Sequence, residues 1–197
     1  MGKQLVVLIS GTGSNLQALL DHGALGGEVN RVVSDRPDAA GLERARARGV
    51  DAVCVAPGAH DDRRGWDAAL CDAVAAAAPD LVVLAGFMRI LSPAFVNRWP
   101  VLNVHPSLLP AFPGARAVAD ALDWGVKLTG ATVHFVDEEV DHGPIVAQEA
   151  VPVRPDDTPA SLHRRIQAVE HRLLPECVAL FCHDRLAVRG RQVSVRA

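Results

Sequence analysis

The sequence predicts a Rossmann-like, doubly wound α/β fold: a mostly parallel sheet followed by a C-terminal antiparallel hairpin. Leu5–Ile9 and Leu81–Ala85 are short, continuous apolar runs, which are typical of parallel strands buried on both faces. Segments of helical length lie between such runs, as parallel crossovers require. Leu128–Val136 alternates between apolar and polar residues instead, which favours an antiparallel or edge strand.

Composition narrows the class of protein. A length of 197 residues suits one domain covering residues 1–197, and 49% hydrophobic with 22% charged residues excludes disorder. The net charge of -3 gives no basic field, so no nucleic-acid partner is expected. The cysteines form no CxxC pair, which argues against structural zinc and a disulfide framework. We see no signal peptide and no membrane-length apolar run, so we expect a cytoplasmic protein without a membrane partner.

The first hundred residues alternate between strands and helices. The expected elements, in order, are a strand over Leu5–Ile9, a helix opening at Leu16, a strand over Val29–Val33, a helix over about Asp38–Arg48, a strand over Ala52–Val55, a helix capped by Asp61 or Asp62 and ending at Ala78, a strand over Leu81–Ala85, and a helix starting at Ser92-Pro93.

The remaining residues begin with a buried strand that stops at Pro106, because proline cannot donate to a sheet ladder. The elements expected after it are a short helix over Ala117–Trp124, two strands over Leu128–Val136 and Ile145–Val153 joined by a long acidic tip, a helix from Pro159 to about Phe181, and a small hairpin over Leu186–Val195.

Ser10–Asn15 is a glycine loop between the first strand and the first helix, an arrangement that aims free backbone N–H groups at a phosphate. The third glycine of a dinucleotide fingerprint would fall at Leu16, and no lysine follows as in a nucleoside-triphosphate loop. A single terminal phosphate therefore fits better than a pyrophosphate. A tight turn capped by Ser14 or Asn15 is the structural alternative.

Asn103, His105 and Asp141 are the candidate catalytic residues. Asn103 and His105 alternate on one strand, so both point to the same face at its carboxyl end, where α/β proteins bind ligands. An amide can donate to a developing oxyanion, and an imidazole beside a carboxylate can act as an acid. This set suits acyl transfer to an amine carried by the substrate, although a structural role for the Asn-x-His pair remains open. Ser107 lacks a nucleophile elbow, and a metal site at His105 has no supporting spacing.

Two further features have both a functional and a structural interpretation. The loop Gly86–Leu91 is apolar, which suits the wall of a flat ring-binding pocket, but Phe87 and Leu91 could simply pack the loop down. Arg63 and Arg64 stand in the first turn of a helix, where cations oppose the dipole. They indicate a nearby anion or form a solvated surface pair.

Four motifs occur in the right order to resemble the phosphoribosylglycinamide formyltransferases, a folate-dependent family of the formyltransferase superfamily. They are Ser10–Asn15, Leu84–Leu91, Leu102–Pro110 and Val140–Pro144, and Gln167-x-x-Glu170-His171 extends the resemblance into the last long helix. The central motif alone marks the superfamily, whereas the glycine loop with Gln-x-x-Glu points to this member.

The resemblance implies the formyltransferase fold and transfer of a formyl group from 10-formyltetrahydrofolate, the co-substrate, to the amine of N1-(5-phosphoribosyl)glycinamide in de novo purine (IMP) synthesis. It implies small-molecule substrates, no metal, and a phosphate-binding half over about 1–100 before a folate-binding and catalytic half over about 101–197. The absence of an obvious exposed apolar face favours a monomer or weak homodimer. The implied roles are catalysis by Asn103, His105 and Asp141, with Asp141 favouring the imidazolium; acceptor binding by Gly13, Ser14, Asn15, Gln167 and Glu170; and folate binding by Arg63, or its neighbour Arg64, Met88, Arg89, Ile90, Leu91, Asn103, Asp137, Glu138, Glu139, Val140 and Asp141.

The sequence departs from the family pattern at two positions. Arg116 lies where relatives commonly carry histidine, and His142 replaces a small residue after the aspartate, which could narrow the donor loop. Rival interpretations are another folate-dependent formyltransferase, a formyltetrahydrofolate hydrolase, or a non-catalytic nucleotide-binding module. The first two should carry an extra domain, and the third leaves Asn103, His105 and Asp141 without a role.

Overall fold

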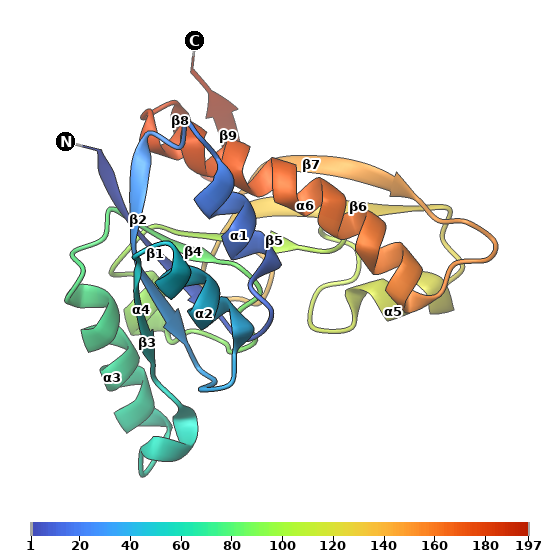
Figure 1. The fold of residues 1–197 in the computed structure, drawn as a ribbon. Helices are drawn as coiled ribbons and strands as arrows, with labels where there is room; N and C mark the ends of the chain where they lie inside the picture. Colours follow the sequence, from blue (N-terminus) through green and yellow to red (C-terminus); the bar gives the residue numbers. More distant parts are fainter. Residues whose placement is uncertain (1, 197) are drawn as a thin grey trace.

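In a computed structural model, which describes residues 2–196, one nine-stranded sheet runs through the molecule in the order β3-β2-β1-β4-β5-β6-β7-β9-β8 (Figure 1). The strands are β1 (Lys3–Ile9), β2 (Gly27–Ser34), β3 (Asp51–Cys54), β4 (Leu81–Leu84), β5 (Val101–His105), β6 (Leu128–Phe135), β7 (Ile145–Pro152), β8 (Leu186–Arg189) and β9 (Gln192–Val195). The helices are α1 (Ser14–Asp21), α2 (Ala40–Ala47), the 3-10 turn η1 (Pro57–Ala59), α3 (Arg63–Ala75), α4 (Pro93–Val96), α5 (Ala117–Asp123) and α6 (Pro159–Cys182).

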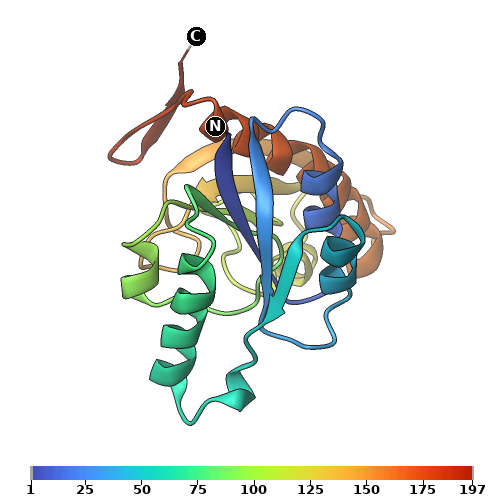
Figure 2. The ribbon, with the colours of Figure 1, turned by 60° about the vertical axis from the view of Figure 1, so that its left-hand side comes forward.

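Helices cover both faces of the sheet, which explains why its central strands are apolar throughout. Leu5 and Val7 of β1 pack into the apolar cluster beneath α1, α2 and α6, whereas Val6 and Leu8 pack against α3 and α4 on the opposite face. Figures 1 and 2 show the two helical layers on either side of β1 and β2. The predicted doubly wound class is confirmed.

Strand order reverses between β1 and β4, so the loops that follow these two strands border one crevice. The loops are also bonded to each other. The Ser10 amide donates to the Gly86 carbonyl at 3.1 Å, and the Met88 amide donates to Ser10 Oγ at 2.8 Å. The glycine loop and the apolar loop after β4 therefore form one wall.

β5 is the last strand of the parallel set. β6 pairs with it antiparallel, with His134 opposite Asn103, and β7 pairs antiparallel with β6, as predicted for the hairpin. Because β6 lies between two neighbours, it is an interior strand and not an edge strand. β9 joins β7 at Ile145–Gln192 and pairs with β8, so the last hairpin extends the same sheet.

Helix starts agree with the sequence signals except at α1. Asp62, one of two predicted caps, accepts from the Gly65 amide at 2.7 Å and starts α3. The first turn of α1 has Gly13 as its N-cap, and no side chain within residues 2–196 caps it. The alternative of a turn capped by Ser14 or Asn15 is therefore wrong. Within those residues we find no helix with the length and apolarity that a membrane span needs.

Candidate active site

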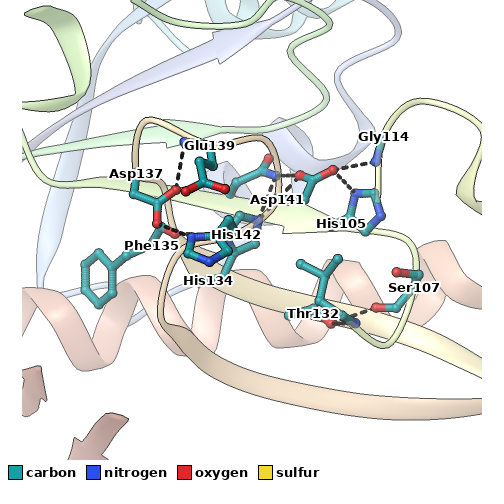
Figure 3. A network of polar contacts seen from close by, with 12 residues as sticks. His105, Ser107, Gly114, Thr132, His134, Phe135, Asp137, Glu139, Asp141 and His142 are labelled. Atoms are coloured by element: carbon teal, nitrogen blue, oxygen red, sulfur yellow. Dashed lines mark hydrogen bonds and ion pairs between the residues drawn. The ribbon is translucent and has the colours of Figure 1, made fainter. Parts of the chain in front are cut away.

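The carboxyl half of β5 supplies an amide and an imidazole to one site. Asn103 and His105 are two residues apart on the strand, so both contact Asp141 from the same side. Asp141 comes from the acidic loop, residues 137–143, which joins β6 to β7. Figure 3 shows its carboxylate in contact with both His105 and the Gly114 amide.

The Asp141 carboxylate contacts three groups: the Gly114 amide and the side chains of His105 and Asn103. Oδ2 accepts from the Gly114 amide at 2.7 Å and lies 3.4 Å from His105 Nδ1, while Oδ1 lies 3.5 Å from Asn103 Nδ2. Asp141 has a φ of 53°, in the left-handed region that few residues other than glycine adopt. The structure thus brings the three predicted catalytic side chains together, with the aspartate on a strained turn.

The ring nitrogens of His105 have different partners. Nε2 lies 2.8 Å from the Phe112 carbonyl, which can only accept, so Nε2 carries a hydrogen. The other ring nitrogen, Nδ1, faces Asp141. An imidazolium at this position has its second N–H directed at the carboxylate.

His134 is a member of the site that sequence reasoning did not select. Its side chain is 1% exposed and lies between Asn103 Nδ2, at 3.1 Å from Nε2, and Asp141 Oδ1, at 3.7 Å from Nε2. Nδ1 donates to the Phe135 carbonyl at 2.8 Å, and burial lowers the pKa of His134. The neutral ring therefore presents Nε2 as an acceptor that orients the amide of Asn103.

A cavity of about 410 Å³ opens beside these groups. Its wall includes every predicted folate-binding residue except Arg63: Met88, Arg89, Ile90, Leu91, Asn103, Asp137, Glu138, Glu139, Val140 and Asp141. The residues of the two predicted loops thus face each other across one pocket. Its apolar character suits a flat aromatic ring.

The apolar loop after β4 serves both of its proposed purposes. Phe87 and Leu91 are buried against the α3 side of the sheet, as the packing interpretation predicts, and both also line the cavity. Met88 and Ile90 are 69% and 63% exposed and stand at the rim of the cavity. Arg89 is held by the buried Asp35, with Nε 2.7 Å from Oδ2.

Arg63 supports the cavity from outside. Its guanidinium donates to the Ile90 carbonyl, pairs with Asp67 at 2.8 Å and lies 4.9 Å from the ring centre of Trp66. These contacts fix the rim of the apolar loop from α3. They favour Arg63 over Arg64 as the arginine that acts at this site.

A second cavity, of about 210 Å³, lies at the glycine loop. All predicted acceptor-binding residues line it: Gly13, Ser14, Asn15, Gln167 and Glu170. Gly13 has a φ of 72°, and a Cβ there would lie 2.6 Å from the Cα of Gly41, so the close approach of α2 requires glycine. The uncapped amides of α1 point to an anion at this cavity.

Glu170 reaches the second cavity from α6. It is 4% exposed, and its Oε2 accepts from Asn15 Nδ2 at 3.0 Å. Burial raises the pKa of Glu170, because the charged form loses its hydration. This pair joins the glycine loop to the last long helix and leaves Asn15 Oδ1 buried without a partner among residues 2–196.

The two cavities adjoin. Gly86, Met88, Val104 and Pro106 line both of them, and Val104 stands between Asn103 and His105 on β5. Molecules bound in the two cavities would therefore meet beside the amide and the imidazole. Within residues 2–196, no group of three His, Cys, Asp or Glu residues is arranged to hold a metal ion.

The fold and this site define an α/β group-transfer enzyme with two adjoining substrate cavities. The sequence matches the family described as Formyl transferase over residues 3–178. It is 49% identical to a phosphoribosylglycinamide formyltransferase of Mycobacterium tuberculosis, over 98% of this chain and 91% of that protein. The corresponding Escherichia coli protein is 45% identical, over 92% and 88%. The crystal structure of glycinamide ribonucleotide transformylase 1 from Symbiobacterium toebii superposes with a TM-score of 0.97 at 50% identity, covering 100% of this chain and 95% of that one. The chain therefore belongs to the formyl transferase family and, within it, to the phosphoribosylglycinamide formyltransferases.

Proposed function

We propose that this chain transfers the formyl group of 10-formyltetrahydrofolate to the amine of N1-(5-phosphoribosyl)glycinamide, a step in purine (IMP) biosynthesis. The observation that carries the proposal is the meeting of the two cavities beside Asn103 and His105. One cavity has the apolar walls that a pterin ring requires, and the other has the free helix amides that a phosphate requires. The names of the relatives supply the formyl group and the phosphoribosylglycinamide acceptor.

Each substrate has one place in this arrangement. The 5′-phosphate of the acceptor lies against the amides of Gly13, Ser14 and Asn15, and Gln167 and Glu170 contact its ribose and glycinamide. The pterin of the donor lies between the apolar loop, Met88 to Leu91, and the acidic loop. The amine and the formyl carbon then come together over β5, which supplies the proximity that accelerates a reaction between two bound molecules.

The chemical step needs one oxyanion donor and one proton carrier. The acceptor amine attacks the formyl carbon, and the negative charge that develops on the formyl oxygen is stabilised by Asn103 Nδ2 and by the imidazolium of His105. Asn103 Nδ2 has two hydrogens. The contact with His134, at 3.1 Å, is kept, and the longer contact with Asp141, at 3.5 Å, is exchanged for the oxyanion.

Collapse of the tetrahedral intermediate completes the transfer. The bond between the formyl carbon and N10 of the folate breaks, and N10 takes a proton from His105 Nδ1. The attacking nitrogen gives its extra proton to Asp141. Because Asp141 Oδ2 and His105 Nδ1 are 3.4 Å apart, the carboxylate can return that proton to the imidazole. Tetrahydrofolate and the N-formyl product leave with all protons accounted for.

The test is a direct assay with both purified substrates. Formation of tetrahydrofolate must depend on the glycinamide ribonucleotide and must give one N-formyl product for each folate released. Folate release without an acceptor would indicate a hydrolase, and transfer only to a different amine would indicate another formyltransferase. Binding of the ribonucleotide without turnover would indicate a nucleotide-binding module, and each of these results would refute the proposal.

A further inference from the structure

We propose that Arg191, at the tip of the β8–β9 hairpin, is a positioning residue that holds the acidic loop in the conformation that places Asp141 against His105. The role of Asp141 rests on the proposed function, whereas the contact itself does not. Arg191 lines neither cavity and acts through His142, the residue next to Asp141.

Arg191 makes a two-pronged contact with His142. Its Nη2 donates to the His142 backbone carbonyl at 2.6 Å, and its Nη1 lies 3.0 Å from His142 Nε2. The other ring nitrogen, Nδ1, lies 2.8 Å from Asp137 Oδ2. Arg191 Nη1 also lies 3.4 Å from Nδ1, so it is close to both ring nitrogens and the guanidinium packs against the imidazole instead of lying along one lone pair. Contacts therefore run from the hairpin to His142, through its backbone carbonyl and its ring, and from His142 to Asp137 across the loop (Figure 3 shows the Asp137–His142 part).

The acidic loop requires this support because its backbone is strained at Asp141. Asp141 has a φ of 53°, and such a residue persists only where neighbouring contacts hold it. At the base of the loop, the Phe135 amide donates to the Pro144 carbonyl at 2.8 Å; on the far side, Asn97 Nδ2 donates to Glu138 Oε1 at 2.8 Å. Arg191 supplies the anchor immediately after Asp141.

The hairpin has few other contacts that would explain where its tip lies. β8 and β9 are four residues each and largely exposed, and an isolated hairpin of that kind is barely stable. β9 pairs with β7 at Ile145–Gln192 only, directly beside Arg191. Figure 2 shows the hairpin projecting from the body of the molecule. The pairing of Gln192 with Ile145 thus places Arg191 next to the acidic loop.

The sharpest test compares Arg191→Ala with Arg189→Ala. Both variants remove one exposed arginine from the same hairpin, but Arg189 makes no side-chain hydrogen bond or ion pair with residues 2–196. Hydrogen exchange of the Gly114 amide in the unliganded chain reports whether the acidic loop stays in place, because this amide donates a hydrogen bond to Asp141 Oδ2. We expect exchange at Gly114 to rise about 5- to 30-fold in Arg191→Ala and to stay unchanged in Arg189→Ala, as the loss of partly exposed, charge-assisted hydrogen bonds implies.

Kinetics provide the second readout. Arg191→Ala should lower kcat by a similar factor of about 5- to 30-fold while KM for the acceptor stays unchanged. Arg191→Lys should restore part of the rate because a lysine can still donate to the His142 carbonyl. The kcat of His142→Ala should lie between those of Arg191→Ala and the wild type, because this variant keeps the backbone carbonyl to which Arg191 donates.

Two results would overturn the proposal. One is equal exchange and equal kcat in Arg191→Ala and Arg189→Ala. The other is a uniform rise in exchange over the whole chain in Arg191→Ala, which would mean that the arginine stabilises the fold and does not position the loop. Exchange needs no substrate, so a failure of the proposed formyl transfer would leave this measurement interpretable.

Discussion

Replacing Asp141 by asparagine is the perturbation that tests the site most directly. The change keeps the shape of the side chain and removes its charge. In the folded protein the carboxylate lies 3.4 Å from His105 Nδ1, and both side chains are nearly buried. An asparagine can still accept from the Gly114 amide, but its NH₂ group then faces Asn103 Nδ2, which is also a donor.

The expected loss follows from the charge pair. Two unit charges 3.4 Å apart attract by about 5 kcal/mol at an effective dielectric of about 20. Water at the open cavity weakens this attraction, so we expect the transition state to lose about 3–5 kcal/mol. Since about 1.4 kcal/mol corresponds to a tenfold change, kcat should fall by about 10²- to 10⁴-fold.

The assay is steady-state formyl transfer between about pH 5 and 9, with thermal unfolding measured on the same samples. Asp72→Asn is a matched control, because this exposed aspartate of α3 carries the same charge far from both cavities. A folded Asp141→Asn enzyme within fivefold of the wild-type kcat would refute the role assigned to the carboxylate.

Four other substitutions, one of them with a matched control, test single groups. Asn103→Ala should lower kcat by about 10²- to 10³-fold with the fold retained, because one oxyanion donor contributes about 2.7–4 kcal/mol; kcat and circular dichroism check this. Burial lowers the pKa of His134, so the unfolded chain binds a proton at this ring more readily than the folded chain does. The free energy of unfolding should therefore fall as the pH drops below about 6.5. His134→Gln should weaken this pH dependence in urea titrations. Burial raises the pKa of Glu170, so the folded chain keeps a proton that the unfolded chain releases above about pH 4.3. The free energy of unfolding should therefore fall as the pH rises from about 4.3 through the pKa of the folded state. Glu170→Gln should remove this pH dependence. Arg63→Ala should raise KM for the folate donor about 5- to 10-fold through the lost contact with the Ile90 carbonyl, whereas Arg64→Ala should leave it unchanged.

Local signals in the sequence were sufficient for most of the elements. The apolar run at β1 is buried on both faces, as its lack of alternation predicts, and Asp62 caps α3. The signal was ambiguous where a tertiary contact decides the outcome. At α1, either Ser14 or Asn15 could have been the cap by composition. The close approach of α2 to Gly13, and the bond from Asn15 to Glu170, assign these residues to other tasks.

Contacts between residues that are distant in the sequence could not be predicted from the sequence alone. His134 was visible as a histidine inside an alternating strand, but its role depends on pairing with Asn103, which is fixed by the antiparallel placement of β6 beside β5. The link from Arg191 to His142 depends in turn on the parallel register of β9 on β7. Spacing within one segment carries no information about such registers. The family resemblance supplied the pairing of Asn103, His105 and Asp141, which their spacing alone left open.

The path of the acidic loop explains why this site needs anchors outside the sheet. β6 runs antiparallel to β5 and ends at Phe135 opposite Leu102, and the next residue still bonds to Val101. The loop therefore leaves from the amino end of β5 and must fold back by about 10 Å, three residues of strand, to reach His105. The sheet itself fixes Asn103 and His105, whereas Asp141 depends on the Gly114 amide, on its own left-handed turn and on the contacts of His142. Substitutions of the buried apolar residues of β5 should thus affect both stability and rate, and substitutions at the loop anchors should lower the rate with little change in the free energy of unfolding.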